Sequence, residues 1–247
     1  MRKFGLIGYP LSHSFSRKYF TEKFEEEGIK DCVYENFSLP EISALKPVLE
    51  DKELCGLNVT IPYKEQVIPF LHDKSEVVRE TGACNCIRIQ DGRLTGHNTD
   101  VVGFGISMTR KLQPHHTQAL ILGTGGAAKA VEYVLRKLRI SYQYVSRQGR
   151  AEADKPAILS YEQIDAEVLR THTLLINTTP LGMYPKTEEC PPLPYDAITP
   201  SHYLYDLVYN PARTLFLRKG EEQGAVVENG HDMLILQAEE SWRIWSL

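Results

Sequence analysis

A chain of 247 residues with 42% hydrophobic and 24% charged residues has the composition of a globular protein, large enough for one large domain or two modest ones. Its 28 Lys and Arg residues against 32 Asp and Glu residues give a formal net charge of −4, so no basic surface for a nucleic acid is expected. No signal-peptide core and no bilayer-length apolar run is found, so no membrane partner is expected. Five scattered cysteines are typical of the cytoplasm, where we expect the protein.

Short apolar segments alternate with amphipathic ones through the first 99 residues. Strands are predicted at 3–8, 33–37 and 56–60, and helices at 17–27 and 41–50. Gly28 is a typical residue to end the first helix, and Pro62 stops the third strand because it cannot donate to a sheet. The alternation of strands and helices predicts a parallel sheet.

A second unit is predicted to begin between residues 98 and 101. Its expected elements are a helix at 101–112, a strand at 118–122 that runs into glycines, a helix after them, strands at 141–145, 173–176 and 203–207, and a closing helix at 233–245. Composition alone does not show whether the closing helix returns to the first domain.

The segment Gly123-x-Gly125-x-x-Ala128 lies between an apolar strand and an amphipathic helix, as a dinucleotide-binding loop does. Gly123 permits the tight turn, Gly125 lets the backbone approach a pyrophosphate, and Ala128 lets the helix pack close to the strand. The helix N-terminus presents N–H groups and the positive end of its dipole to the phosphates. We therefore predict a nicotinamide-dinucleotide site; a strand–helix turn without a ligand is the alternative.

The end of the next strand indicates which dinucleotide binds. NAD-binding chains usually place an acidic residue there, about 20 positions on, to bond the ribose hydroxyl. This chain has Ser146-Arg147-Gln148-Gly149-Arg150 instead. Guanidinium groups bond the oxygens of a 2′-phosphate in pairs, so the predicted cofactor is NADP(H). Ordinary surface arginines are the alternative.

Three polar clusters lie outside the cofactor unit, at 12–16, at 58–64, and at 82–85 together with 96–100. They follow predicted strand ends, where α/β sheets bind ligands, and their hydroxyls and amides suit a small polyol. From the residues alone, Lys64 is more often a solvated surface lysine, and Asp100 is a plausible cap for the helix after it.

The order and spacing of these residues resemble the shikimate dehydrogenase family. The matching motifs are the serine pair Ser12/Ser14, Asn58-Val59-Thr60-x-Pro62-x-Lys64, Gly82-Ala83-x-Asn85, Asn98-Thr99-Asp100-x-x-Gly103, Gly123-x-Gly125-Gly126-Ala127, Asn177-x-Thr179-Pro180-x-Gly182-Met183, Asp206-x-x-Tyr209-x-Pro211-x-x-Thr214 and Gly230-x-x-Met233-Leu234-x-x-Gln237. They span nearly the whole chain in order, which is far more specific than any single match.

The resemblance implies an α/β fold of two domains: an N-terminal α/β shikimate-binding catalytic domain at 1–99, to which the closing helix (230–247) returns, and a Rossmann-type NADP-binding domain at 100–229. It implies Lys64 and Asp100 as the acid–base pair. Implied substrate ligands are Ser12, Ser14, Thr60, Asn85, Tyr209 and Gln237. Implied cofactor contacts are Gly123, Thr124, Gly125, Gly126, Ala127, Ser146, Arg147, Arg150, Leu207 and Gly230.

The family reaction is the reversible NADPH-dependent reduction of 3-dehydroshikimate to shikimate in aromatic amino-acid (chorismate) biosynthesis. By resemblance, we expect a monomer or homodimer that acts on this small molecule. Two alternatives stay open: a quinate/shikimate dehydrogenase paralogue with a preference for NAD, and a non-catalytic dinucleotide-binding regulator.

Three positions depart from the family pattern. Arg17 stands where a proline usually opens the first helix, Cys86 replaces a threonine, and Ser146 replaces an asparagine before the cofactor arginine. Cys84 and Cys86 form a C-x-C pair with no second pair or histidine at ligand spacing, so we predict buried thiols and no metal site.

Overall fold

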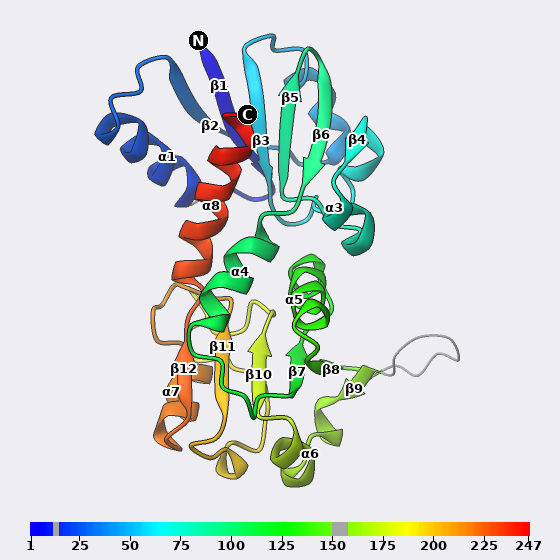
Figure 1. Ribbon diagram of the computed structural model, residues 1–247, viewed down its shortest axis with the longest axis vertical. Coiled ribbons are helices and arrows are strands. Elements are labelled where there is room, and N and C mark those ends of the chain that lie inside the picture. Colours follow the sequence, from blue (N-terminus) through cyan, green and yellow to red (C-terminus); the bar gives the residue numbers. More distant parts are fainter. Residues whose placement is uncertain (12–14, 150–157) are drawn as a thin grey trace. The chain divides into compact units, whose positions relative to one another are not determined.

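The computed structural model describes residues 1–11, 15–149 and 158–247. The chain divides into two compact units (Figure 1): unit 1 comprises Met1–Thr99 and Ala238–Leu247, and unit 2 comprises Asp100–Gln237. Among the described residues, no helix is both long and apolar enough to cross a membrane.

Unit 1 is built on a mixed six-stranded sheet. Its strands are β1 (Arg2–Gly8), β2 (Cys32–Ser38), β3 (Leu54–Val59), β4 (Asp73–Lys74), β5 (Cys86–Gln90) and β6 (Arg93–His97), in the order β2-β1-β3-β5-β6-β4. β1 pairs in parallel with β2 and β3, but β5 runs antiparallel to β3 and β6. The parallel arrangement predicted from the first three strands is confirmed for them, whereas β5 and β6, where no strand was predicted, add an antiparallel part. Asp91 and Gly92 both have positive φ and join β5 to β6 in a two-residue turn.

The helices of unit 1 are α1 (Phe15–Glu26), α2 (Leu45–Val48), α3 (Glu76–Thr81) and the end of α8 (His231–Trp245). α1 and α8 cover one face of the sheet (Figure 1), where Phe4, Phe20 and Trp245 are packed. The helix predicted at 41–50 is instead a 3₁₀ turn (Ile42–Ala44) followed by the single turn of α2, which contains Pro47. Proline lacks the backbone donor that a longer helix needs.

Unit 2 is built on an all-parallel six-stranded sheet. Its strands are β7 (Gln118–Leu122), β8 (Ser141–Ser146), β9 (Ile158–Ser160), β10 (Leu174–Asn177), β11 (Tyr203–Asp206) and β12 (Val226–Glu228), in the order β12-β11-β10-β7-β8-β9. Numbered from β7, this is the 3-2-1-4-5-6 order of dinucleotide-binding folds, so the predicted fold class is confirmed. The order reverses between β7 and β10, and the ligand crevice of such sheets lies at the carboxyl ends of those strands.

The helices of unit 2 are α4 (Asp100–Thr109), α5 (Gly126–Lys137), α6 (Ala166–Thr171), α7 (Leu215–Glu222) and the first part of α8. One apolar core lies under α4, α5 and α8, and a second lies on the other face of the sheet with α6 and α7. All of 230–247 was predicted to return to the first domain, whereas the helix passes to unit 1 only at Ala238. The reason is a close crossing of α4 and α8: a methyl group added at Gly103 would lie 2.5 Å from the Met233 carbonyl oxygen and 3.1 Å from the Gln237 nitrogen.

Candidate active site

The glycine loop after β7 lies at the point where the strand order of unit 2 reverses. Gly123 has φ +109°, and a methyl group added there would lie 2.7 Å from Thr178 Oγ1, so only glycine fits. Gly125 caps α5 without a side-chain hydrogen bond, and a methyl group added to it would meet no described atom within 4 Å. Ala128 is buried between α5 and the sheet. The loop thus combines a tight turn, open space and a helix N-terminus, which fits the pyrophosphate of a dinucleotide.

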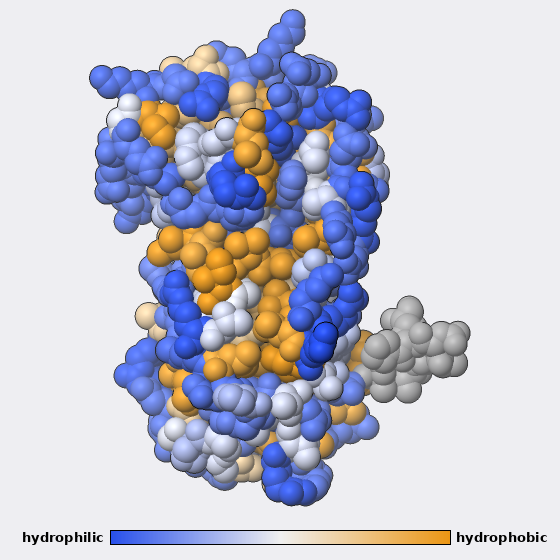
Figure 2. All heavy atoms as spheres, in the orientation of Figure 1, coloured by the Kyte–Doolittle hydropathy of each residue, from blue (hydrophilic) through white to orange (hydrophobic). Residues whose placement is uncertain are grey.

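The other loop residues that were predicted to contact the cofactor are accessible. Thr124 is exposed, and Gly126 and Ala127 are half-buried. Apolar side chains gather around α4 and the carboxyl ends of β10 and β11 on the face of unit 2 seen in Figure 2. Leu207, the residue after β11, is partly buried, and Met183 is 47% exposed. An apolar surface at this edge of the sheet suits the flat rings of a nucleotide.

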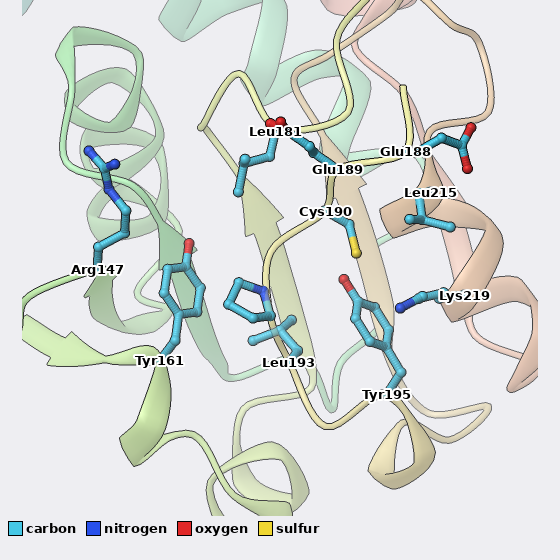
Figure 3. A pocket seen from close by; sticks show the side chains of 11 residues that line it. Arg147, Tyr161, Leu181, Glu188, Glu189, Cys190, Leu193, Tyr195, Leu215 and Lys219 are labelled. Atoms are coloured by element: carbon cyan, nitrogen blue, oxygen red, sulfur yellow. The ribbon is translucent and has the colours of Figure 1, made fainter. Parts of the chain in front are cut away.

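The strand next to β7 ends at the predicted ribose-binding residues. Ser146 is the last residue of β8 and is half-buried, and Arg147 follows it with an exposed side chain. Arg147 borders an open pocket of about 540 Å³ together with Tyr161 and Leu193 (Figure 3). Arg150, the other predicted phosphate ligand, lies outside the described residues. Tyr161 was not singled out from the sequence.

A buried carboxyl group holds the segment that carries Leu207 and Tyr209. Asp206, at the end of β11, is 0% exposed and accepts hydrogen bonds from Thr214 Oγ1 at 2.5 Å, from Asn177 Nδ2 at 2.9 Å and from the Val208 backbone nitrogen at 3.0 Å. Burial raises the pKa of Asp206 to about 6, although the three hydrogen bonds oppose the shift. Asp206 and Thr214 belong to one sequence motif, but no task was predicted for Asp206, whose partner Asn177 lies 29 residues away along the chain.

Gly230 fixes the same segment from the other side. Its backbone nitrogen donates to the Val208 carbonyl oxygen at 3.2 Å. A methyl group added at Gly230 would lie 2.1 Å from the Leu207 carbonyl oxygen. The two predicted cofactor residues Leu207 and Gly230 therefore pack backbone to backbone, and Tyr209, which is half-buried, follows two residues later.

Three of the predicted substrate and catalytic residues of unit 1 lie at one edge of its sheet. Thr60 follows β3, and its backbone N–H donates to the Ile7 carbonyl oxygen at 2.9 Å. The Lys64 carbonyl oxygen accepts a hydrogen bond from the Cys84 backbone nitrogen at 2.8 Å. Val59 donates to the Asn85 carbonyl oxygen at 2.8 Å. Because β5 is antiparallel, its start lies beside the end of β3, which brings these residues together. Lys64 itself is half-buried, so it is not a freely solvated lysine.

The Asn85 side chain is engaged with the residue before Asp100. It is 3% exposed, its Oδ1 accepts from the Thr99 backbone nitrogen at 2.6 Å, and its Nδ2 donates to Thr99 Oγ1 at 3.0 Å. Thr99 Oγ1 in turn lies 3.2 Å from Ser241 Oγ of α8. The Asn85 side chain thus holds Thr99, the last residue of the N-terminal part of unit 1. This structural role is additional to the substrate contact predicted for Asn85.

In unit 2, Asp100 and Gln237 belong to the two helices that cross at Gly103. Asp100 is the first residue of α4 and is 6% exposed, and Gln237 is 8% exposed, with its Nε2 donating to the Leu234 carbonyl oxygen at 2.9 Å. Asp100 and Gly103 are three residues apart and so share a helix face. Ser12 and Ser14, the remaining predicted substrate ligands, lie outside the described residues.

Cys84 and Cys86 are both buried, as predicted. Burial is the largest cause that raises the pKa of the Cys86 thiol. Within the part of the chain that the structure describes, no group of three or more His, Cys, Asp or Glu side chains is arranged to hold a metal ion.

Comparisons with known proteins agree with this architecture. Residues 6–87 match the family model for the shikimate dehydrogenase substrate binding domain. The chain is 34% identical to the NADP(+) shikimate dehydrogenase of Methanosphaera stadtmanae over 98% of its own length and 90% of that protein. It resembles the Thermus thermophilus shikimate 5-dehydrogenase solved with NADP(H) and shikimate (TM-score 0.85, 30% identity, 100% of this chain and 94% of that one). It also resembles the Corynebacterium glutamicum quinate dehydrogenase solved with NAD (TM-score 0.86, 28% identity, 99% and 93%). The chain belongs to the shikimate dehydrogenase family.

Proposed function

We propose that this protein catalyses the reversible, NADPH-dependent reduction of 3-dehydroshikimate to shikimate in aromatic amino-acid (chorismate) biosynthesis. The observation that carries the proposal is the edge of unit 1, where Thr60, Lys64 and Asn85 lie together in a chain that aligns with an NADP(+) shikimate dehydrogenase over 98% of its length. The open glycine loop of unit 2 supports the same conclusion, because it fits a dinucleotide. We propose a cytoplasmic enzyme that acts as a monomer or homodimer.

The proposed chemistry divides between cofactor and protein. When bound, NADPH supplies the hydride, so the protein has to orient the substrate and move one proton. The Lys64 ammonium group stabilises the negative charge that develops on the carbonyl oxygen and donates the proton to it. Asp100 holds the ammonium group in place or relays the proton. The burial of Asp100 and the half-burial of Lys64 support these roles, since limited solvent strengthens their electrostatic effect.

The remaining family residues are proposed as ligands. Ser12, Ser14, Thr60, Asn85, Tyr209 and Gln237 would bind the hydroxyl and carboxylate groups of the substrate. The loop at 123–127 would bind the pyrophosphate, and Ser146, Arg147 and Arg150 the phosphorylated ribose. Leu207 and Gly230 would also contact the cofactor. The close backbone contact of Leu207 with Gly230 supports their common role, because it fixes one against the other.

A second candidate is a quinate/shikimate dehydrogenase that prefers NAD. The observation in its favour is the likeness to the quinate dehydrogenase solved with NAD. Parallel assays with shikimate and quinate, each with NADP⁺ and NAD⁺, separate the two. The proposed function requires the largest kcat/KM for shikimate with NADP⁺, and a larger value for quinate or for NAD⁺ would favour the second candidate.

Replacing Lys64 tests the catalytic assignment. We expect Lys64→Ala to lower kcat by about 100- to 10,000-fold, the usual effect of a positioned acid–base group, with an unchanged far-UV circular dichroism spectrum and unchanged Kd for NADP⁺. Lys52→Ala, at an exposed lysine of unit 1, is the matched control and should keep full activity. A Lys64→Ala enzyme with near-normal kcat would refute the assignment. If the wild-type protein binds NADP⁺ but shows no activity with shikimate or with quinate, the non-catalytic regulator is favoured.

A further inference from the structure

Arg147 and Tyr161 leave neighbouring parallel strands at the same edge of the sheet. Ser146 of β8 pairs in register with Ser160 of β9, so the residue after each serine reaches the carboxyl edge at the same height. Gly149, with φ +52°, turns the chain closely past β9, since a methyl group added to it would lie 3.0 Å from the Ser160 backbone nitrogen. The Ser160 nitrogen donates to Gln163 Oε1 at 2.8 Å, which fixes the turn that begins at Tyr161.

The ring of Tyr161 is anchored and its hydroxyl is available. The ring packs against the apolar core under α6 and α7, and the residue is half-buried. Within the described ranges, no hydrogen bond is formed by the Tyr161 hydroxyl. Figure 3 shows Arg147 and Tyr161 at one end of the pocket, with the hydroxyl and the guanidinium group pointing the same way in that view. Burial raises the pKa of Tyr161 while the Arg147 charge lowers it, so the phenol stays protonated and is a donor at neutral pH.

Two cationic residues border the pocket, Arg147 at this end and Lys219 beside Tyr195 at the far end, together with two carboxylates. Glu188 and Glu189 lie on the opposite part of its wall, where Glu188 is 3.6 Å from an Arg218 nitrogen and Glu189 is 3.4 Å from Lys186 Nζ. Those carboxylates would repel a phosphate. A guanidinium group beside a phenol donor offers a dianion both charge and a charge-assisted hydrogen bond.

We propose that the Tyr161 hydroxyl donates a hydrogen bond to the ribose 2′-phosphate of NADP(H), beside Arg147, and thereby helps to set the preference for NADP over NAD. The inference rests on the proposed cofactor role of Arg147. It adds a residue to the site that no sequence motif contains. The alternative is that Tyr161 only forms the wall of the pocket with its ring.

Equilibrium binding of ligands that differ by the 2′-phosphate tests this role. We expect Tyr161→Phe, which keeps the ring, to raise the Kd for NADP⁺ and for adenosine 2′,5′-bisphosphate by about ten-fold, as loss of a hydrogen bond to a charged group does. The Kd values for NAD⁺ and for 5′-AMP should not change in the same calorimetric titrations. Tyr195→Phe is the matched control, because Tyr195 lines the far side of the same pocket and its hydroxyl already donates to the Pro191 carbonyl oxygen at 2.8 Å.

Two outcomes would overturn the inference: equal weakening of NADP⁺ and NAD⁺ by Tyr161→Phe, or no change for any of the four ligands. Arg147→Gln separates this failure from failure of the underlying cofactor assignment. If Arg147→Gln selectively weakens the 2′-phosphorylated ligands while Tyr161→Phe does not, the inference on Tyr161 falls and the role of Arg147 stands. If neither variant changes the ratio of the NADP⁺ and NAD⁺ Kd values, both assignments fall.

Discussion

Asp206→Asn removes a buried ionisable group while it keeps the shape of the side chain. Asp206 is fully buried, and its carboxyl group accepts three hydrogen bonds from the surrounding segments of unit 2. Burial penalises the ionised form, and it raises the pKa of Asp206 to about 6 from an ordinary value of 3.8. The substitution therefore isolates the effect of one titration on the stability of unit 2.

The sign of the effect follows from proton binding. Between pH values of 3.8 and about 6 the folded protein holds this proton more tightly than the unfolded chain does. The resulting stabilisation is fully present below 3.8 and is lost as the pH rises through about 6. The pKa difference corresponds to about 3 kcal/mol, and most of it is lost between about pH 4 and about pH 7. The unfolding free energy of the wild type minus that of D206N should decrease by this amount as the pH is raised.

Urea unfolding followed by far-UV circular dichroism at several pH values measures this difference. The two tryptophans, Trp242 and Trp245, both belong to unit 1, so their fluorescence follows that unit separately. Asp165→Asn is the control for loss of one surface carboxylate in unit 2, because asparagine caps the start of α6 about as well as aspartate. A difference between wild type and D206N that stays constant with pH, or that increases as the pH rises, would refute the reasoning.

Two glycine substitutions test the backbone contacts of unit 2. Gly230→Ala should lower kcat by about 100-fold, because the new methyl group has to displace the Leu207 backbone, and a shift of about 1 Å in a residue at the site can lower the rate this much. Steady-state kinetics measure the change, and an unchanged kcat would contradict the prediction. Gly103→Ala should destabilise the protein by about 1–3 kcal/mol and raise the KM for shikimate more than the Kd for NADP⁺, because it pushes α8 and Gln237 away from α4. Gly105→Ala on the same helix is its control, since that methyl group would meet nothing described closer than 3.7 Å; equal effects of the two substitutions would count against the role of Gly103.

Local pattern was sufficient to predict the centre of unit 2. The strand predicted at 118–122 has those bounds in the structure, because a buried parallel strand gives an unbroken apolar run that ends at the glycines. The following helix carries Val131, Val134 and Leu135 on its buried side, which is a helical spacing. Gly123 has φ +109°, which agrees with the tight turn that the loop motif predicts there.

The hairpin of unit 1 was missed although a signal for it was present. Asp91-Gly92 between two alternating segments favours a two-residue turn, and this turn makes β5 and β6 antiparallel. The interpretation of alternating strands and helices as parallel units overlooked it. The hydrogen bond from Asn177 to Asp206 and the pairing of Ser146 with Ser160 are of a different kind, because they join segments that local sequence does not connect.

Unit 2 is an insertion into unit 1, since Asp100–Gln237 separate Met1–Thr99 from Ala238–Leu247. The last segment completes the interior of unit 1: the Trp245 indole donates to the Ile87 carbonyl oxygen at 3.0 Å, and its ring fills the space beside Gly56. During synthesis on the ribosome, the whole of unit 2 has therefore been made before unit 1 receives its final core residues. Until Trp245 has been synthesised, the apolar face of the N-terminal segment that packs against it stays exposed to solvent. The strands of the inserted unit have all been synthesised by then.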